Sequence, residues 1–231
     1  MMSNLTSLNL PSDPLSVDSD EARARAKLVL TLRGLGIGDR AVLSAIERVP
    51  RRLFLSAAHH GLAYEDSSIP IECGQAVLAP SFVARIVQSL QIEAGQRILE
   101  VGTGSGYQAA VLAHLGAEVD SIDRYSTLAS LARQRIAALK LSNVRIHKGD
   151  GLEGLKQNAP FHRIVLTGAV TEIPEALLSQ LGPRGILIAP VGEPSAPQRL
   201  VRIIRGDDKD EQQVLEIVRM VSLTKGRSER L

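Results

Sequence analysis

The chain has 231 residues, of which 44% are hydrophobic, 23% charged and 3% aromatic, with a net charge of +2. This length fits one sizeable α/β domain with an N-terminal extension. The scarcity of aromatic side chains and the nearly balanced charge argue against a nucleic-acid partner, because such a partner needs stacking surfaces or a strongly basic face.

Residues 1–20 mix Ser, Asp, Pro and Leu in irregular order, which predicts a flexible tail without a signal-peptide pattern. We find no apolar run long enough to cross a membrane, and one cysteine excludes an internal disulfide or a cysteine-based metal cluster. The sequence therefore predicts a cytoplasmic protein with no metal site.

Apolar spacing predicts helices over residues 21–35 and 39–49, the second capped by Asp39 and ended by Pro50. Residues 51–79 show no sustained period, and a loop of that length in a compact protein is usually functional. Pro80 can open the next helix as its first residue.

Strand-like and helix-like runs alternate from residue 97 onward. The expected strands cover residues 97–101, 118–122, 144–147, 161–167 and 185–190, and the expected helices cover 106–115, 125–139 and 174–181. This alternation predicts right-handed βαβ units and a parallel sheet with helices on both faces. Two last strand-like runs, 198–205 and 212–223, are joined by polar residues and predict an antiparallel hairpin.

The segment after the first of these strands is rich in glycine. It contains Glu100 and then three alternating glycines within residues 102–106, followed by Tyr107. A dinucleotide-binding turn would place a glycine where Tyr107 stands, which weakens a pyrophosphate interpretation. Glu100 would repel an anion and favour a ligand with an amino group and a sulfonium, as in S-adenosylmethionine. Glycine-rich turns are common in α/β proteins, so the turn alone does not decide the ligand.

Two further carboxylates end the next strands. Asp123 closes the second strand, where an acid can accept hydrogen bonds from ribose hydroxyls, and Asp150 closes the third, where it can accept from an adenine amino group. Each acid taken alone could instead cap a helix or face solvent in a turn. Together with Glu100, at the carboxyl ends of neighbouring strands, they favour a methyl-donor site.

Several motifs outside the glycine turn carry a family resemblance. They are Val49-Pro50-Arg51, Tyr64-Glu65-Asp66, Ile69-Pro70-Ile71, Gly74-Gln75, Gly149-Asp150-Gly151 and Pro190-Val191-Gly192. Over residues 21–223 the chain resembles the protein-L-isoaspartate O-methyltransferases. The motifs ahead of the glycine turn are specific to that family, whereas the turn is shared by many methyltransferases.

The resemblance implies a Rossmann-like class I methyltransferase fold, with a seven-stranded sheet and a C-terminal antiparallel hairpin. We expect the flexible tail over residues 1–20, an N-terminal helical extension with a substrate loop over 21–95, and a methyltransferase core over 96–231. The activity that the resemblance implies is methyl esterification of L-isoaspartyl residues in damaged proteins, with S-adenosylmethionine as donor and a peptide or protein carboxylate as acceptor. We also expect a monomer.

The same resemblance assigns roles at the site. The methionine part of the donor would be held by Glu100, Gly102, Thr103, Gly104, Ser105 and Gly106, its ribose by Asp123, and its adenine by Asp150 and Gly151. Residues 79–82 would cover the donor by backbone contacts.

The chain departs from the family in the substrate loop. Leu78 stands where the family places a serine hydroxyl beside the carboxylate, Ala76 removes a second hydroxyl, and Glu72 replaces a glycine. An acid at Glu72 would repel an acidic substrate unless its side chain points outward. Losing one hydrogen bond costs roughly 1–3 kcal/mol, about ten- to a hundredfold in rate. Two alternatives remain, a methyltransferase for another acceptor and a donor-binding relative with little activity.

Overall fold

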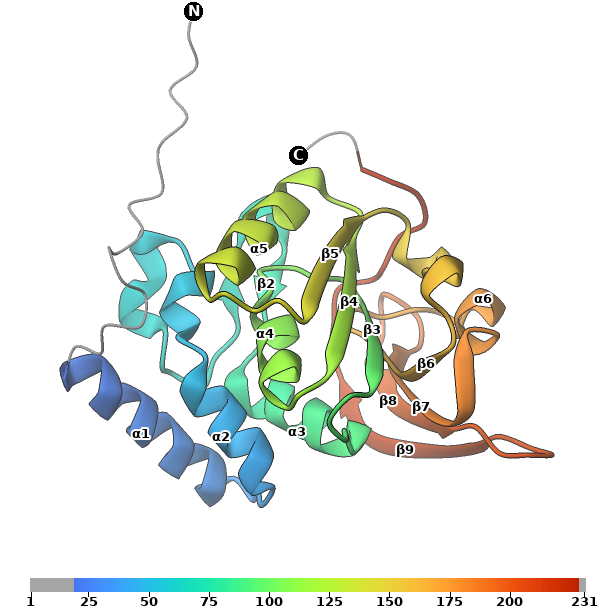
Figure 1. Cartoon of the computed structure of the whole chain (residues 1–231), viewed down its shortest axis with the longest axis horizontal. Helices are drawn as coiled ribbons and strands as arrows, with labels where there is room; N and C mark the ends of the chain where they lie inside the picture. Colours follow the sequence, from blue (N-terminus) through green and yellow to red (C-terminus); the bar gives the residue numbers. More distant parts are fainter. Residues whose placement is uncertain (1–18, 229–231) are drawn as a thin grey trace, which may run out of the picture.

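The computed structural model describes residues 19–228, so most of the predicted tail lies outside the described residues. A seven-stranded sheet forms the centre, in the order β5-β4-β3-β6-β7-β8-β9 (Figure 1). Its strands are β3 Arg97–Val101, β4 Glu118–Asp123, β5 Val144–Lys148, β6 Phe161–Leu166, β7 Leu181–Val191, β8 Gln198–Ile204 and β9 Glu211–Val218.

The strand directions match the expected topology. Strands β3, β4, β5, β6 and β7 pair in parallel, whereas β8 runs antiparallel to β7 and β9 antiparallel to β8. The parallel sheet and the C-terminal antiparallel hairpin are therefore confirmed. Strand β7 begins earlier than expected because buried Leu181 pairs with Phe161, which limits the preceding helix α6 to Glu175–Leu178.

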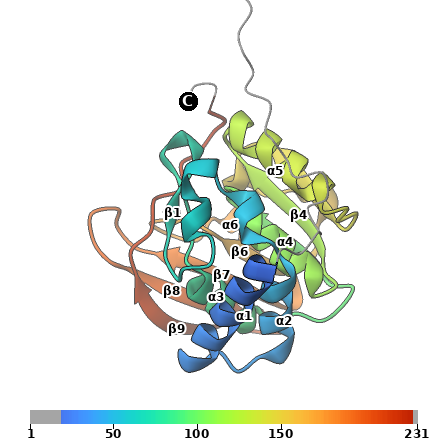
Figure 2. The ribbon, with the colours of Figure 1, turned by 90° about the vertical axis from the view of Figure 1, so that its left-hand side faces the viewer.

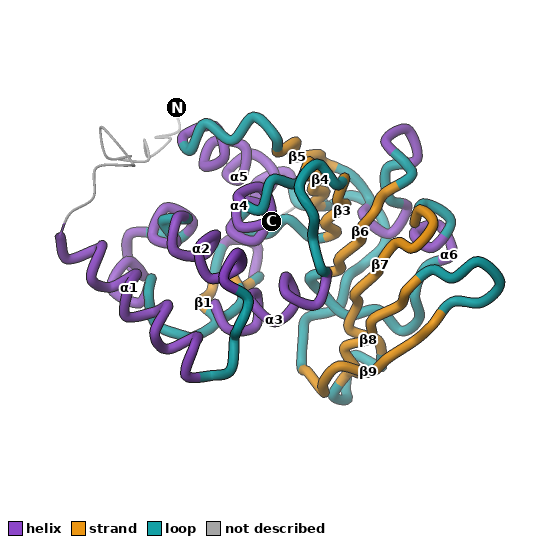
Figure 3. Tube along the Cα trace, turned by 60° about the horizontal axis from the view of Figure 1, so that its bottom comes forward, coloured by secondary structure: helices purple, strands orange, loops and turns teal. Residues whose placement is uncertain are grey.

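Helices cover the sheet unequally on its two faces (Figures 1 and 3). The longer ones are α1 Ser19–Gly34, α2 Arg40–Arg48, α3 Pro80–Leu90, α4 Tyr107–His114 and α5 Ser126–Ala138. Alternate strand residues face opposite sides, so Ile98 and Val119 join the core under these helices, whereas Leu99 and Ile122 join a second core. The second core is closed by α6 and short 3-10 turns. Within the described residues, we find no helix with the length and apolar character that a membrane span requires.

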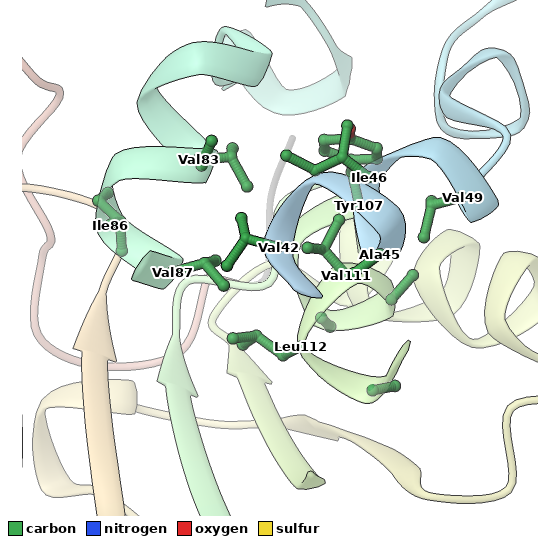
Figure 4. Close-up of a cluster of buried hydrophobic side chains, with 14 of the residues drawn as sticks. Val42, Ala45, Ile46, Val49, Val83, Ile86, Val87, Tyr107, Val111 and Leu112 are labelled. Atoms are coloured by element: carbon green, nitrogen blue, oxygen red, sulfur yellow. The ribbon is translucent and has the colours of Figure 1, made fainter. Parts of the chain in front are cut away.

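The N-terminal helices share the core of the sheet. In Figure 4, Val42 of α2 lies between Val83 of α3 and Val111 of α4, and Ile46 of α2 lies beside Tyr107 of α4. Helix α2 contacts α1, α3 and α4, so the extension is continuous with the core in packing. A domain boundary near residue 95 stays a prediction.

Residues 51–79, expected to be a long loop, form short 3-10 helices and a small two-stranded sheet. The 3-10 helices are η1 Arg51–Phe54, η2 Ala57–Leu62 and η3 Glu72–Gly74, and the strands are β1 Ile69–Pro70 and β2 Ala76–Val77, which pair antiparallel. Figure 2 shows β1 beside the C-terminal segment. Such short elements carry too few residues to show a period, which explains why the sequence pattern missed them.

A buried arginine holds this region together. The guanidinium of Arg51 is fully buried and donates hydrogen bonds to the backbone carbonyls of Ala63, Glu65, Ser67 and Leu78 at 2.9–3.2 Å. Backbone carbonyls in an irregular segment need such donors when water is excluded. Arg51 therefore fixes the backbone at Leu78, which lies far from it in sequence.

Candidate active site

A cavity of 270 Å³ opens beyond the carboxyl ends of β3, β4 and β6. Ligands of open α/β sheets bind at this edge, where the strand order reverses. Of the residues expected at the site, the cavity is lined by Leu78, Glu100, Gly102, Thr103, Gly104, Ser105, Asp123 and Gly151. Gly106 and Asp150 do not line it.

Two glycines shape the turn between β3 and α4. Gly102 has φ of +96°, and a Cβ there would lie 2.2 Å from the hydroxyl oxygen of Thr167. Gly106 has φ of +90° and lies against Ala132 of α5, where a Cβ would sit 3.1 Å from the alanine Cβ. Glycine is thus required at both positions. Gly106 serves helix packing, which accounts for its place outside the cavity lining.

Glu100 is the buried acid of the site. Its side chain is 0% exposed and accepts hydrogen bonds from Ser121 Oγ at 2.5 Å and Gln108 Nε2 at 3.0 Å. Thr103 Oγ1 extends this network by a 2.6 Å contact with Ser121 Oγ. Burial outweighs both hydrogen bonds and raises the pKa of Glu100 to about 8.

Asp123 lies at the end of β4, as expected from the sequence. Its carboxylate is 5% exposed and accepts hydrogen bonds from the backbone N–H of Gly104 and of Tyr125, each at 2.9 Å. Burial raises the pKa of Asp123 above its ordinary value. Each oxygen retains a second lone pair, which is suited to a ligand hydroxyl.

Asp150 has a different setting. One oxygen accepts from Leu152 N at 3.0 Å and caps the turn, while the other accepts from Gly226 N at 2.5 Å and fastens the C-terminal segment. Its neighbour Gly151 does line the cavity, and a Cβ there would lie 2.6 Å from Val101 Cγ1. A contact between Asp150 and adenine stays a prediction.

Two further segments, far apart in sequence, also line the cavity. They are Ser68 with residues 75–78, and residues 219–224, and Figure 2 shows both on one side of the molecule. Leu223 of the second segment lies beside the glycine turn, with its Cδ2 3.6 Å from the Cβ position at Gly102. Leu78 is half-buried, and Ala76 beside it is exposed. Arg219, in the second of these segments, adds a positive charge to the cavity lining and forms no ion pair with another described residue.

Two residues of the cavity, Arg219 and Thr167, were not expected from the sequence. Thr167 Oγ1 donates to the backbone oxygen of Gly102 at 2.6 Å and so supports the glycine turn. Each is a single polar residue after a strand, and only the fold shows that both reach the cavity. Glu72, whose charge raised the question of repulsion, is not among the lining residues. Within residues 19–228 no three His, Cys, Asp or Glu side chains gather as a metal site would require.

The family model described as protein-L-isoaspartate(D-aspartate) O-methyltransferase matches residues 23–228 of the chain. A protein-L-isoaspartate O-methyltransferase of Azorhizobium caulinodans is 48% identical, with 90% of this chain and 97% of that protein covered. One of Parvibaculum lavamentivorans is 43% identical, with 93% and 97% covered.

Solved structures give the same similarity. A protein-L-isoaspartate O-methyltransferase structure has a TM-score of 0.79 and 26% identity, and the match covers 86% of this chain and 65% of that one. A Plasmodium falciparum structure described as a protein-L-isoaspartate O-methyltransferase with S-adenosyl-L-homocysteine has a TM-score of 0.76 and 25% identity, with 87% and 98% covered. The seven-stranded methyltransferase sheet expected from the sequence is thereby confirmed.

Proposed function

The chain belongs to the protein-L-isoaspartate(D-aspartate) O-methyltransferase family, and on that basis we propose that it methyl-esterifies isoaspartyl residues of damaged proteins with S-adenosylmethionine as donor. The observation that carries this proposal is the cavity itself. It combines a buried carboxylate and a glycine turn with the apolar residues 76–78 and with Arg219, which forms no ion pair with another described residue. The carboxylate and the turn suit a cationic nucleoside, and the arginine suits an acidic peptide group.

The residues on the donor side fit S-adenosylmethionine. Glu100 is an acid without a cationic partner in its immediate network, and Gln108 Oε1 is buried without a hydrogen-bond partner among the described residues. Both residues line the cavity and can receive the donor's ammonium group. Gly102 and Gly104 bring the backbone to the cavity surface, and Asp123 offers free lone pairs for the ribose hydroxyls.

The donor supplies a methyl group on a sulfonium centre, and the carboxylate oxygen bonds to its carbon while the bond to sulfur breaks. An α-carboxylate is already ionised at neutral pH, so the protein needs no general base. Its contribution is to align the two reactants and to exclude water. Buried Val77 and half-buried Leu78 supply the apolar wall, and the Arg51 hydrogen bond fixes that wall in place.

Acceptor recognition must differ from the family pattern because residues 76 and 78 lack hydroxyls. Arg219 and Thr224 line the same cavity and come from the C-terminal segment. We propose that they hold the isoaspartyl group, by charge and by hydrogen bond respectively. We also propose that the protein is a cytoplasmic monomer, as expected from the sequence.

The test is transfer of a radiolabelled methyl group to an isoaspartyl peptide and to the same peptide with normal aspartate. Selective, base-labile labelling of the first peptide supports the proposal. Labelling of another acceptor alone would favour a different methyltransferase. Heat from S-adenosylhomocysteine in calorimetry, without turnover on any acceptor, would favour a donor-binding relative.

A further inference from the structure

A short segment of the substrate loop, residues 71–75, lies against the glycine turn of residues 102–106, which we call the donor turn. Ile71 Cδ1 comes within 3.7 Å of the Cβ position at Gly104, and η3, the next residues in the chain, packs against α5. The segment closes on itself through a 2.8 Å hydrogen bond from Ile71 N to Gln75 O. It then continues directly into β2 and Leu78, which line the cavity and which, together with Arg219, we call the acceptor wall.

Arg135 of α5 holds the donor turn from the other side. Its side chain is 3% exposed, and Nη1 donates to the backbone oxygen of Ser105 at 3.2 Å. Burial lowers the pKa of Arg135, and the negative charge that opposes this effect is that of Glu72. A buried cation is costly unless a charge or hydrogen bonds compensate it.

Glu72 supplies the negative charge that opposes the effect of burial on Arg135. Its Oε2 is buried without a hydrogen-bond partner among the described residues, although the side chain as a whole is half-buried. No ion pair within 4.0 Å joins it to a described residue, and it lies on η3, which packs against α5, the helix of Arg135. The attraction between the two charges therefore acts across more than 4.0 Å, and water weakens it less at a buried site than at an exposed one. It also explains how an acid is accommodated beside the path of an acidic substrate.

We propose that Glu72 is a positioning residue, which fastens residues 71–75 onto the donor turn through Arg135 and thereby sets the acceptor wall relative to the donor. The expected effect of Glu72 on catalysis rests on the proposed function. Its expected effect on donor binding and on the position of residues 71–75 does not. These two effects can therefore be tested separately.

Cys73 provides a probe inside the segment, since it is half-buried and the chain contains one cysteine. Its rate of reaction with a thiol reagent is measured with and without S-adenosylhomocysteine, and the ratio of the two rates is the protection factor. Using the ratio largely removes the effect of Glu72 on the thiol's own pKa. In Glu72→Gln we expect the protection factor to fall about fivefold, with a comparable loss of S-adenosylhomocysteine affinity by calorimetry.

The matched control is Glu47→Gln, which neutralises an exposed acid on α2 and should leave both values unchanged. Arg135→Gln keeps an amide donor for Ser105 but removes the charge. If the two charges act together, the double variant Glu72→Gln/Arg135→Gln should lose less than the sum of the single variants. Additive losses, or a protection factor unchanged in Glu72→Gln, would overturn the proposal.

Methyl transfer separates this inference from the proposed function. With an isoaspartyl peptide, Glu72→Gln should raise KM for both donor and peptide about fivefold while kcat falls less, because positioning and not chemistry is impaired. If the wild-type protein methylates no isoaspartyl peptide but the Cys73 and calorimetry results are as expected, the proposed function is wrong, whereas the role of Glu72 in positioning residues 71–75 is supported. If the wild-type protein methylates the peptide and Glu72→Gln does so with unchanged KM values, the proposed function is supported and the effect of Glu72 on catalysis is ruled out.

Discussion

Ser121 Oγ donates a 2.5 Å hydrogen bond to the carboxylate of Glu100 across two neighbouring strands. The register explains this contact, because the two residues are directly paired in the parallel ladder of β3 and β4. The hydrogen bond does not offset burial, and the pKa of Glu100 rises to about 8. Without a donor, Glu100 is therefore mostly protonated at neutral pH, and a cationic ligand would favour its ionised form.

Donor affinity should depend on pH for this reason. If S-adenosylmethionine requires ionised Glu100, its affinity should rise by about tenfold per pH unit up to about pH 8 and then level off. Calorimetry between pH 6 and 9 measures this directly. Glu100→Gln should bind more weakly and with little pH dependence, and a flat profile for the wild-type protein would rule out the linkage.

Glu100 should also make the donor-free fold sensitive to pH. Its folded pKa of about 8 lies above the ordinary 4.5, so its stabilising contribution is complete below pH 4.5 and is lost as the pH rises through 8. Glu100→Gln should therefore be more stable than wild type at pH 8.5, with a smaller difference at pH 5. Gln108 can rotate its unpartnered Oε1 toward the new amide. Urea unfolding followed by circular dichroism at both pH values decides this, and a less stable variant at pH 8.5 would contradict it.

Arg51 should matter more for stability than its neighbour. Arg51→Met leaves four carbonyls without their donor, and each unsatisfied buried group costs about 1–3 kcal/mol. We expect the free energy of unfolding to fall by more than about 3 kcal/mol. Arg52→Met, which removes a side chain that is half-exposed and only 3.8 Å from Glu21, should cost less than about 1 kcal/mol. Equal losses in urea titrations would show that the carbonyl contacts of Arg51 are not what stabilises the region.

Arg219 should affect the acceptor and not the donor. Arg219→Ala removes a cation of the acceptor wall that pairs with no acid among the described residues, so KM for an isoaspartyl peptide should rise about tenfold while S-adenosylhomocysteine affinity stays unchanged. Arg199→Ala removes an exposed arginine of β8 and serves as the control. A loss of donor affinity with an unchanged KM for the peptide would mean that Arg219 contacts the donor and not the acceptor.

The sequence pattern predicts most of the fold because it repeats over long elements. Helix α5 and strand β4 each fall within two residues of their predicted bounds, since apolar spacing fixes their interior. The pattern fails over residues 51–79, where a buried arginine organises the chain and no period exists.

The donor side of the site was predictable for a related reason. Glu100 and Asp123 lie at the carboxyl ends of consecutive parallel strands, so chain order alone brings them to one edge of the sheet. The place of Arg219 in the cavity was not predictable, because it depends on the path that the chain takes after β9, the last strand of the hairpin. The setting of Asp150 depends on Gly226, a long-range backbone contact that leaves no local signal.

Leu78 offers the sharpest test of the acceptor wall. Its backbone oxygen is held by Arg51 and its side chain lines the cavity, so a serine there would place a hydroxyl beside the bound carboxylate. One added hydrogen bond in the transition state should raise kcat/KM for an isoaspartyl peptide by about tenfold or more. Leu78→Ala is the matched control, because it removes the same bulk without adding a donor. Equal gains in both variants would mean that the leucine only restricts space, and no gain in Leu78→Ser would mean that the acceptor carboxylate is bound elsewhere in the cavity.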